Sequence, residues 1–176
     1  MDDGVSTEFR EDGTCRVGVH ITDVGALVPV GSELDREAAG RVSSLYFPDR
    51  KIPMFPPVVS EVLGSLCPDA PRLALSLFFD LAPDGSAGEA EIVPSVICCR
   101  EKLTYDRADA ILDDPLHPLH ASLLTLHRAA EANWIDRLQA GAVALERSEL
   151  QIRVTPEGEI QVSVRHRNSR SNLLVS

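Results

Sequence analysis

Alternating hydrophobic and polar positions near the start of the chain predict a β-hairpin. Residues 5–10 and 16–21 have the composition of strands, and residues 11–13 (Glu-Asp-Gly) form a typical turn between them. In the second segment every other residue is apolar, which is the period of a strand with one buried face. A tight hairpin brings its two outer ends together, so the beginning of the first strand and the end of the second should be neighbours.

Acidic residues occupy these two outer ends. Asp2 and Asp3 precede the first strand, and Asp23 follows the second. Three carboxylates at one end of a sheet are suited to a hard cation such as Mg²⁺, which often binds one or two carboxylates together with substrate phosphates. The alternative is an acidic tail beside a solvated strand end, because acidic pairs near chain termini are common.

The remaining pattern predicts an α+β fold with a mixed, largely antiparallel sheet and flanking helices. Residues 72–81 and 89–100 are strongly apolar strands joined by a turn at residues 82–85. Ser32 and Thr104 are expected helix N-caps, and Tyr46 follows the last turn of the first helix. The sequence further predicts helices at 33–44, 58–66, 104–112 and 117–140, an irregular turn at 24–30, extended chain at 51–57, a hairpin of 150–154 with 160–164, and a last helix starting after Asn168 or Ser169.

Composition restricts the functional classes. The chain has 176 residues, a 44% hydrophobic fraction and a net charge of −10. Such an acidic domain is not expected to bind nucleic acid by itself. Its four cysteines have no zinc-site spacing, and His20 is expected to make an ordinary hydrogen bond rather than act as a ligand or base. No signal peptide and no run of about 20 apolar residues is present, so we expect no membrane partner and a cytoplasmic location.

Several sequence blocks occur in a fixed order along essentially the whole chain. They are residues 1–6 (MDDGVS), 17–24 (VGVHITDV), 29–38 (PVGSELDREA), 45–56 (LYFPDRKIPMFP), 65–66 (SL), 72–76 (RLALS) and 102–105 (KLTY). Together these blocks resemble the catalytic domain of the ribonuclease II/ribonuclease R family, the RNB domain. The Asp-Asp-Gly sequence is most similar to the organellar and cyanobacterial-like branch, so an organellar location is also open.

The resemblance implies a processive, hydrolytic 3′→5′ exoribonuclease that degrades single-stranded RNA to nucleoside 5′-monophosphates with Mg²⁺. The family builds its metal cluster from four aspartates in one short run, and Asp2 and Asp3 match the last two, as catalytic and metal-binding residues. Tyr46 matches a tyrosine that stacks on the 3′-terminal nucleotide; its alternative is a core aromatic at a helix end. Asp23 matches a further aspartate, with a supporting role.

The chain also departs from the family pattern. The first two aspartates of the cluster would precede residue 1, and the family's catalytic arginine and basic downstream motif would follow Ser176. Leu145 lies near the position where many members carry an RNA-clamping phenylalanine. The cold-shock and S1 RNA-binding domains, which would supply a basic channel around an acidic core, are absent from these 176 residues.

We therefore expect residues 1–176 to be a partial RNB domain, truncated at both ends, from an exoribonuclease, with little or no activity by itself. The alternative is a catalytically inactive RNB remnant that acts as a binding or regulatory protein. A third possibility is an α+β domain whose acidic terminus has no function.

Overall fold

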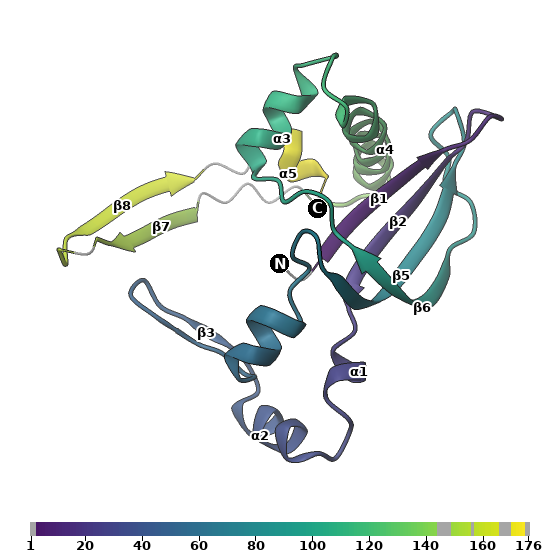
Figure 1. Cartoon of the computed structure of the whole chain (residues 1–176). Coiled ribbons are helices and arrows are strands. Elements are labelled where there is room, and N and C mark those ends of the chain that lie inside the picture. Colours follow the sequence, from purple (N-terminus) through teal and green to yellow (C-terminus); the bar gives the residue numbers. More distant parts are fainter. Residues whose placement is uncertain (1–2, 144–148, 156, 166–169, 175–176) are drawn as a thin grey trace. The chain divides into compact units, whose positions relative to one another are not determined.

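The computed structural model describes residues 3–143, 149–155, 157–165 and 170–174 (Figure 1). The chain divides into two compact units, which are described separately. The first comprises residues 1–82 and 87–102, and the second comprises residues 83–86 and 103–176. None of the described helices is sufficiently long and apolar to cross a membrane.

A four-stranded sheet forms the centre of the first unit. The strands are β1 (Asp3–Phe9), β2 (Cys15–Thr22), β5 (Pro71–Leu81) and β6 (Glu91–Cys98). They lie in the order β1-β2-β5-β6, and each adjacent pair is antiparallel (Figure 1). The predicted hairpin is thus confirmed, and its turn contains Gly13 at a φ of 84°, a conformation that glycine adopts without steric cost.

The register of the sheet places polar side chains in its interior. In β5, Ser76 is fully buried, whereas the adjacent Leu75 is 42% exposed. Ser76 lies opposite His20 in β2, and His20 is itself buried. Exposure alternates along this end of the sheet, but the covered face is the more polar one, and Ile21 of the apolar face of β2 is 56% exposed.

The segment between β2 and β5 contains short elements. They are α1 (Val24–Leu27), α2 (Glu33–Arg41), β3 (Leu45–Tyr46), β4 (Lys51–Ile52) and the π-helix η1 (Val58–Leu63). Ser32 caps α2 as predicted, and its hydroxyl accepts a hydrogen bond from the backbone N–H of Asp35 at 3.2 Å. The predicted end of this helix at Ser44 is wrong: Val42 has a φ of 65°, so the helix stops at Arg41 and the chain continues into β3.

The described residues of the second unit form three helices and a hairpin. They are α3 (Tyr105–Leu112), α4 (His120–Gln139), α5 (Arg170–Leu173) and the pair β7 (Glu149–Val154) and β8 (Ile160–Arg165). The predicted cap Thr104 is confirmed. Helix α4 begins three residues later than predicted, because Pro118 disfavours helical backbone at His117. Asn168 and Ser169 lie outside the described residues.

The short helix α5 is joined to α3 by specific hydrogen bonds. The backbone N–H of Ser171 donates to Oδ1 of Asp109 at 2.9 Å, and the Ser171 hydroxyl donates to the carbonyl of Tyr105 at 3.1 Å. Arg170 pairs with Asp113 at 2.6 Å. These contacts hold the C-terminal helix against α3, whose Ile111 is 1% exposed.

Candidate metal and nucleotide site

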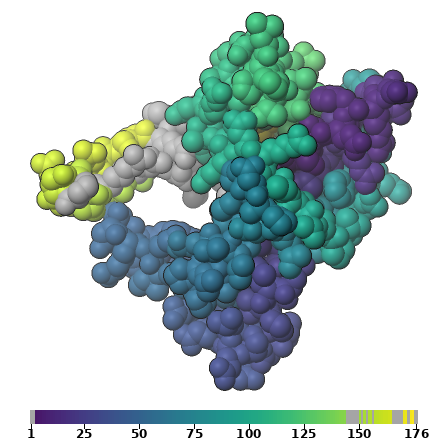
Figure 2. Space-filling model, in the orientation of Figure 1, coloured from purple at the N-terminus to yellow at the C-terminus, as the bar shows by residue number. Residues whose placement is uncertain are grey.

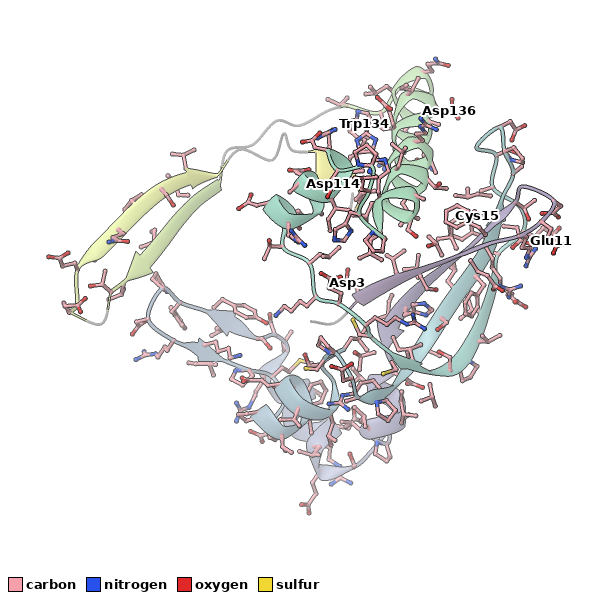
Figure 3. All side chains as sticks on the ribbon, turned by 45° about the horizontal axis from the view of Figure 1, so that its top comes forward. Asp3, Glu11, Cys15, Asp114, Trp134 and Asp136 are labelled. Atoms are coloured by element: carbon pink, nitrogen blue, oxygen red, sulfur yellow. The ribbon has the colours of Figure 1, made fainter. Side chains whose placement is uncertain are left out.

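Asp3 is the first residue of strand β1 (Figure 3). It is exposed and lies opposite Ile21 in the ladder with β2. The backbone of this residue is therefore held by the sheet while its carboxylate remains accessible. Asp2, the other predicted metal ligand, lies outside the described residues.

Asp23 follows β2 and is anchored by two hydrogen bonds. Its backbone N–H donates to the carbonyl of Leu73 at 3.0 Å, and its Oδ1 accepts from the backbone N–H of Ala26 at 3.0 Å. The side chain thus caps the first turn of α1. The supporting role that the sequence suggested for Asp23 stays a prediction, and the structure gives the residue a capping contact with α1.

Within the described ranges, no three acidic, histidine or cysteine side chains are grouped so that they could hold a metal ion. The predicted cluster of Asp2, Asp3 and Asp23 is not tested by this observation, since Asp2 is not described. The chemistry of the acidic pair nevertheless fits Mg²⁺, which prefers carboxylate oxygen and frequently takes only one or two protein carboxylates.

Tyr46 lies in the two-residue strand β3, directly opposite Lys51 in β4. Its predicted position at a helix end is therefore corrected. The side chain is 79% exposed, so the alternative of a core aromatic is wrong. The hairpin formed by β3 and β4 lies at the surface in the space-filling view (Figure 2). Tyr46 and Asp3 belong to the same compact unit.

The turn of this hairpin adds groups that the sequence interpretation did not single out. The backbone N–H of Phe47 donates to the carbonyl of Arg50 at 2.8 Å, which closes a turn through Pro48 and Asp49. The guanidinium of Arg50 lies 5.6 Å from the centre of the Phe47 ring. Exposed aromatic rings beside cationic side chains are the usual components of single-strand nucleic-acid surfaces. In the sequence, the pair Pro48-Asp49 could have predicted this turn.

The other feature that was missed is a polar cluster around the buried side chains of His20 and Ser76. His20 makes hydrogen bonds, as predicted, but its partners Ser6 and Ser76 come from two different strands. Burial lowers the pKa of His20 below its usual value, so the ring is neutral at neutral pH. The sequence could have indicated this cluster, because a serine or histidine occurs at positions that share one face of neighbouring strands.

Leu145, which lies near the position of the family's RNA-clamping phenylalanine, lies outside the described residues.

The profile of the RNB domain matches residues 1–176. The chain belongs to the RNB family. Ribonuclease R of Chlamydia muridarum (strain MoPn / Nigg) is 40% identical to the RNB chain over 146 residues, which cover 82% of the chain and 21% of that protein. The protein named Inactive exonuclease DIS3L2 of Arabidopsis thaliana is 44% identical over 115 residues, which cover 64% of the chain and 11% of that protein.

Solved structures show the same fold. RNase R of Mycoplasma genitalium, in complex with ribose methylated single-stranded RNA, matches with a TM-score of 0.85 at 21% sequence identity, and the match covers 99% of the RNB chain and 28% of that protein. The RNB chain spans about a fifth of the length of the Chlamydia ribonuclease R. Its family is one of exoribonucleases that also includes inactive members, and its mixed helices and antiparallel sheet agree with the predicted fold class.

Proposed function

We propose that the protein that carries this chain is a hydrolytic exoribonuclease that removes nucleotides from the 3′ end of single-stranded RNA and releases nucleoside 5′-monophosphates. The observation that carries the proposal is the RNB match along residues 1–176, in which Asp3 stands exposed at the start of a strand of the central sheet.

Asp2 and Asp3 are the residues of this chain that would hold Mg²⁺. When bound, Mg²⁺ supplies a Lewis acid that lowers the pKa of water and stabilises charge on phosphate oxygens. The contribution of the chain is positional. The β1–β2 ladder holds the backbone of Asp3, and the cap that Asp23 forms on α1 holds the adjacent loop.

Tyr46 would stack on the 3′-terminal base. Stacking uses the face of a base and is tolerant of sequence, which suits an enzyme that degrades a strand one nucleotide at a time. The exposure of Tyr46 supports this role. Lys51, its neighbour in β4, is already paired with Glu61 at 2.6 Å. Because the chain carries a net charge of −10, most attraction for the RNA backbone would come from flanking domains of the cold-shock and S1 type. We place the protein in the cytoplasm, or alternatively in an organelle.

A second candidate is an RNB protein that binds RNA without cleaving it. One observation favours it: a relative named as an inactive exonuclease is 44% identical over 115 residues. In this case Tyr46 and its hairpin would retain RNA binding, while the acidic residues would have no catalytic role.

The test uses the full-length protein and single-stranded RNA labelled at its 5′ end, with Mg²⁺ or Mn²⁺. An exoribonuclease acting from the 3′ end shortens the labelled strand from that end and releases unlabelled nucleoside 5′-monophosphates. We expect Asp3→Asn to lower kcat by about a hundredfold or more, because metal-assisted charge stabilisation contributes several kcal/mol. Asp136→Asn is the matched control, since Asp136 is an exposed aspartate of α4 (Figure 3).

Two results decide between the candidates. Retention of the RNA with no shortening under either metal ion would establish the non-cleaving alternative. If Asp3→Asn released mononucleotides as fully as wild type, Asp3 would not be a metal ligand.

A further inference from the structure

A continuous chain of side-chain hydrogen bonds crosses all four strands of the sheet. Oγ of Ser6 in β1 lies 2.8 Å from Nε2 of His20 in β2, and Nδ1 of His20 lies 2.6 Å from Oγ of Ser76 in β5. Oγ of Ser76 lies 2.5 Å from Oγ of Ser95 in β6. The four residues follow the spatial order of the strands, so the chain links the edge strand β1 to the opposite edge.

The proposed arrangement of protons along these hydrogen bonds starts from Ser95. The carbonyl of Ala74 lies 3.1 Å from Oγ of Ser95 and can only accept a hydrogen bond. If the single Ser95 proton points to this carbonyl, Ser76 donates to Ser95 and accepts from Nδ1–H of His20. In this arrangement the unprotonated Nε2 of His20 accepts from the Ser6 hydroxyl.

The link between Ser6 and His20 depends on the register of β1. Ser6 lies opposite Gly18, and His20 lies opposite Gly4, so the two side chains meet on the diagonal of one face. A Cβ atom on Gly18 would come within 2.6 Å of Oγ of Ser6 and within 2.8 Å of Cε1 of His20. The absence of a side chain at Gly18 is what makes room for the contact.

In the described part of the chain, strand β1 is an edge strand whose large apolar side chains are poorly buried. It pairs only with β2 in the described sheet, and its large apolar residues Val5 and Phe9 are each 52% exposed. Where the apolar pattern is weak, register is weakly specified, and a slip of one residue turns each side chain to the other face. A specific cross-strand hydrogen bond is therefore expected to matter more here than in a central strand.

We propose that Ser6 and His20 are positioning residues, which anchor the start of β1 so that Asp3 stays opposite Ile21. The functional meaning of this anchor rests on the proposed role of Asp3 as a metal ligand. Ser6 lies three residues from Asp3 along β1, so its side chain is on the opposite face of the sheet. The contact between Ser6 and His20 therefore constrains the backbone of the acidic segment and leaves its carboxylates free of that contact.

The spectroscopic part of the test is carried out on the 176-residue chain. The ¹⁵N chemical shifts of the His20 ring at neutral pH should show a protonated Nδ1 and an unprotonated Nε2. An unprotonated Nδ1 with a protonated Nε2 would overturn the proposed direction of the hydrogen bonds. In Ser95→Ala the Ser76 hydroxyl is released from Ser95, so the tautomer is free to change while the contact between Ser6 and His20 remains.

The positional part of the test is hydrogen exchange of the β1 amides. Loss of one hydrogen bond in Ser6→Ala should speed exchange at the start of β1 by about two- to tenfold. Ser6→Thr keeps a hydroxyl and should restore slow exchange. Ser95→Ala removes a hydroxyl from the other end of the chain and should leave β1 unchanged. Equal exchange in wild type and Ser6→Ala, or equal acceleration by Ser95→Ala, would overturn the proposal.

A separate measurement distinguishes failure of this proposal from failure of the proposed function. In the full-length protein, Mn²⁺ bound at Asp3 should broaden the amide signals of β1, and Asp3→Asn should abolish the broadening. If wild type shows no such broadening, the metal-binding role of Asp3 fails. The exchange data still decide whether Ser6 and His20 anchor the strand.

Discussion

The hydroxyl of Thr22 donates a hydrogen bond of 2.8 Å to the backbone carbonyl of Gly64, which lies 42 residues further along the chain. Both residues are buried. The bond ties the end of β2 to the residue that follows η1, so the long connection between β2 and β5 returns to the sheet at a defined place. Arg72 strengthens the same corner by donating from Nε to the carbonyls of Val62 and Ser65.

Replacing Thr22 by valine tests this contact. The substitution keeps the shape of the side chain but leaves the buried carbonyl of Gly64 without its donor. We expect the free energy of unfolding to fall by about 1–3 kcal/mol, measured by urea denaturation. Thr22→Ser keeps the hydroxyl and loses one methyl group, so it should cost only about 1 kcal/mol. A valine variant as stable as wild type would contradict the assignment.

Gly18→Ala should destabilise the sheet by steric overlap. A Cβ atom at this position would lie 2.8 Å from Cε1 of Phe78, in addition to its close approaches to Ser6 and His20. Overpacking of this kind typically costs about 1–3 kcal/mol. We expect a corresponding loss in the free energy of unfolding and a disturbed His20 signal in NMR spectra.

Gly4→Ala is the matched control for this prediction. Gly4 lies in β1, opposite His20, and a Cβ atom there would lie 3.6 Å from Cδ1 of Leu66, an ordinary contact. Because alanine costs less conformational entropy than glycine in a strand, the control should be neutral or stabilising by about 0.5–1 kcal/mol. Equal losses in both variants would show that the space around Gly18 is not the cause.

The elements that were predictable from sequence are those whose ends carry local chemical signals. Ser32 and Thr104 cap helices, and the Asp84-Gly85 turn joins the two long strands. These signals act between residues close in sequence. No local sequence signal predicts the end of α2 at Val42, because a β-branched residue rarely adopts a φ of 65°. For this reason the helix was predicted to be too long, and Tyr46 was not expected in a strand.

The candidate site was predictable only in part for a similar reason. Alternation identifies which residues share a face of a strand, but it does not say which face is covered. The fully buried position of Ser76, beside a Leu75 that is 42% exposed, depends on contacts from distant segments. The motif resemblance identified Asp3 and Tyr46 as candidates, whereas the hydrogen-bond chain through His20 needed the register of all four strands.

Stability should depend on pH through His20. Burial lowers its pKa in the folded protein below the ordinary value of 6.5, so the unfolded chain binds a proton first as the pH falls. The contribution of His20 to the free energy of unfolding is therefore constant above pH 6.5. Between pH 6.5 and the lower pKa of the folded protein, the free energy of unfolding falls with a slope of at most about 1.4 kcal/mol per pH unit. The partners of the ring are the hydroxyls of Ser6 and Ser76 and the edge of Phe78.

His20→Gln provides the comparison for this pH dependence. Glutamine retains hydrogen-bonding groups but does not titrate. The difference in unfolding free energy between wild type and variant should therefore become smaller as the pH falls below 6.5, whatever the other histidines contribute. A difference that is independent of pH would mean that His20 has the same pKa in the folded and unfolded states.

Tyr46→Ala should weaken RNA binding without changing stability. The side chain is 79% exposed, so its removal should leave the free energy of unfolding within about 0.5 kcal/mol of wild type. Loss of one stacked base typically costs about 1–3 kcal/mol of binding, which corresponds to a rise in Kd of about five- to 150-fold for single-stranded RNA in the full-length protein. Tyr46→Phe keeps the ring and should bind like wild type.

An RNA that lacks its 3′-terminal base determines whether Tyr46 contacts that nucleotide. If the ring stacks on this base, removing the base and removing the ring delete the same interaction, and the two losses should not add in a double-mutant cycle. Full additivity would place the contact of Tyr46 elsewhere on the RNA. A loss of affinity in Tyr46→Phe equal to that in Tyr46→Ala would instead indicate that the phenolic hydroxyl, rather than the ring face, makes the contact.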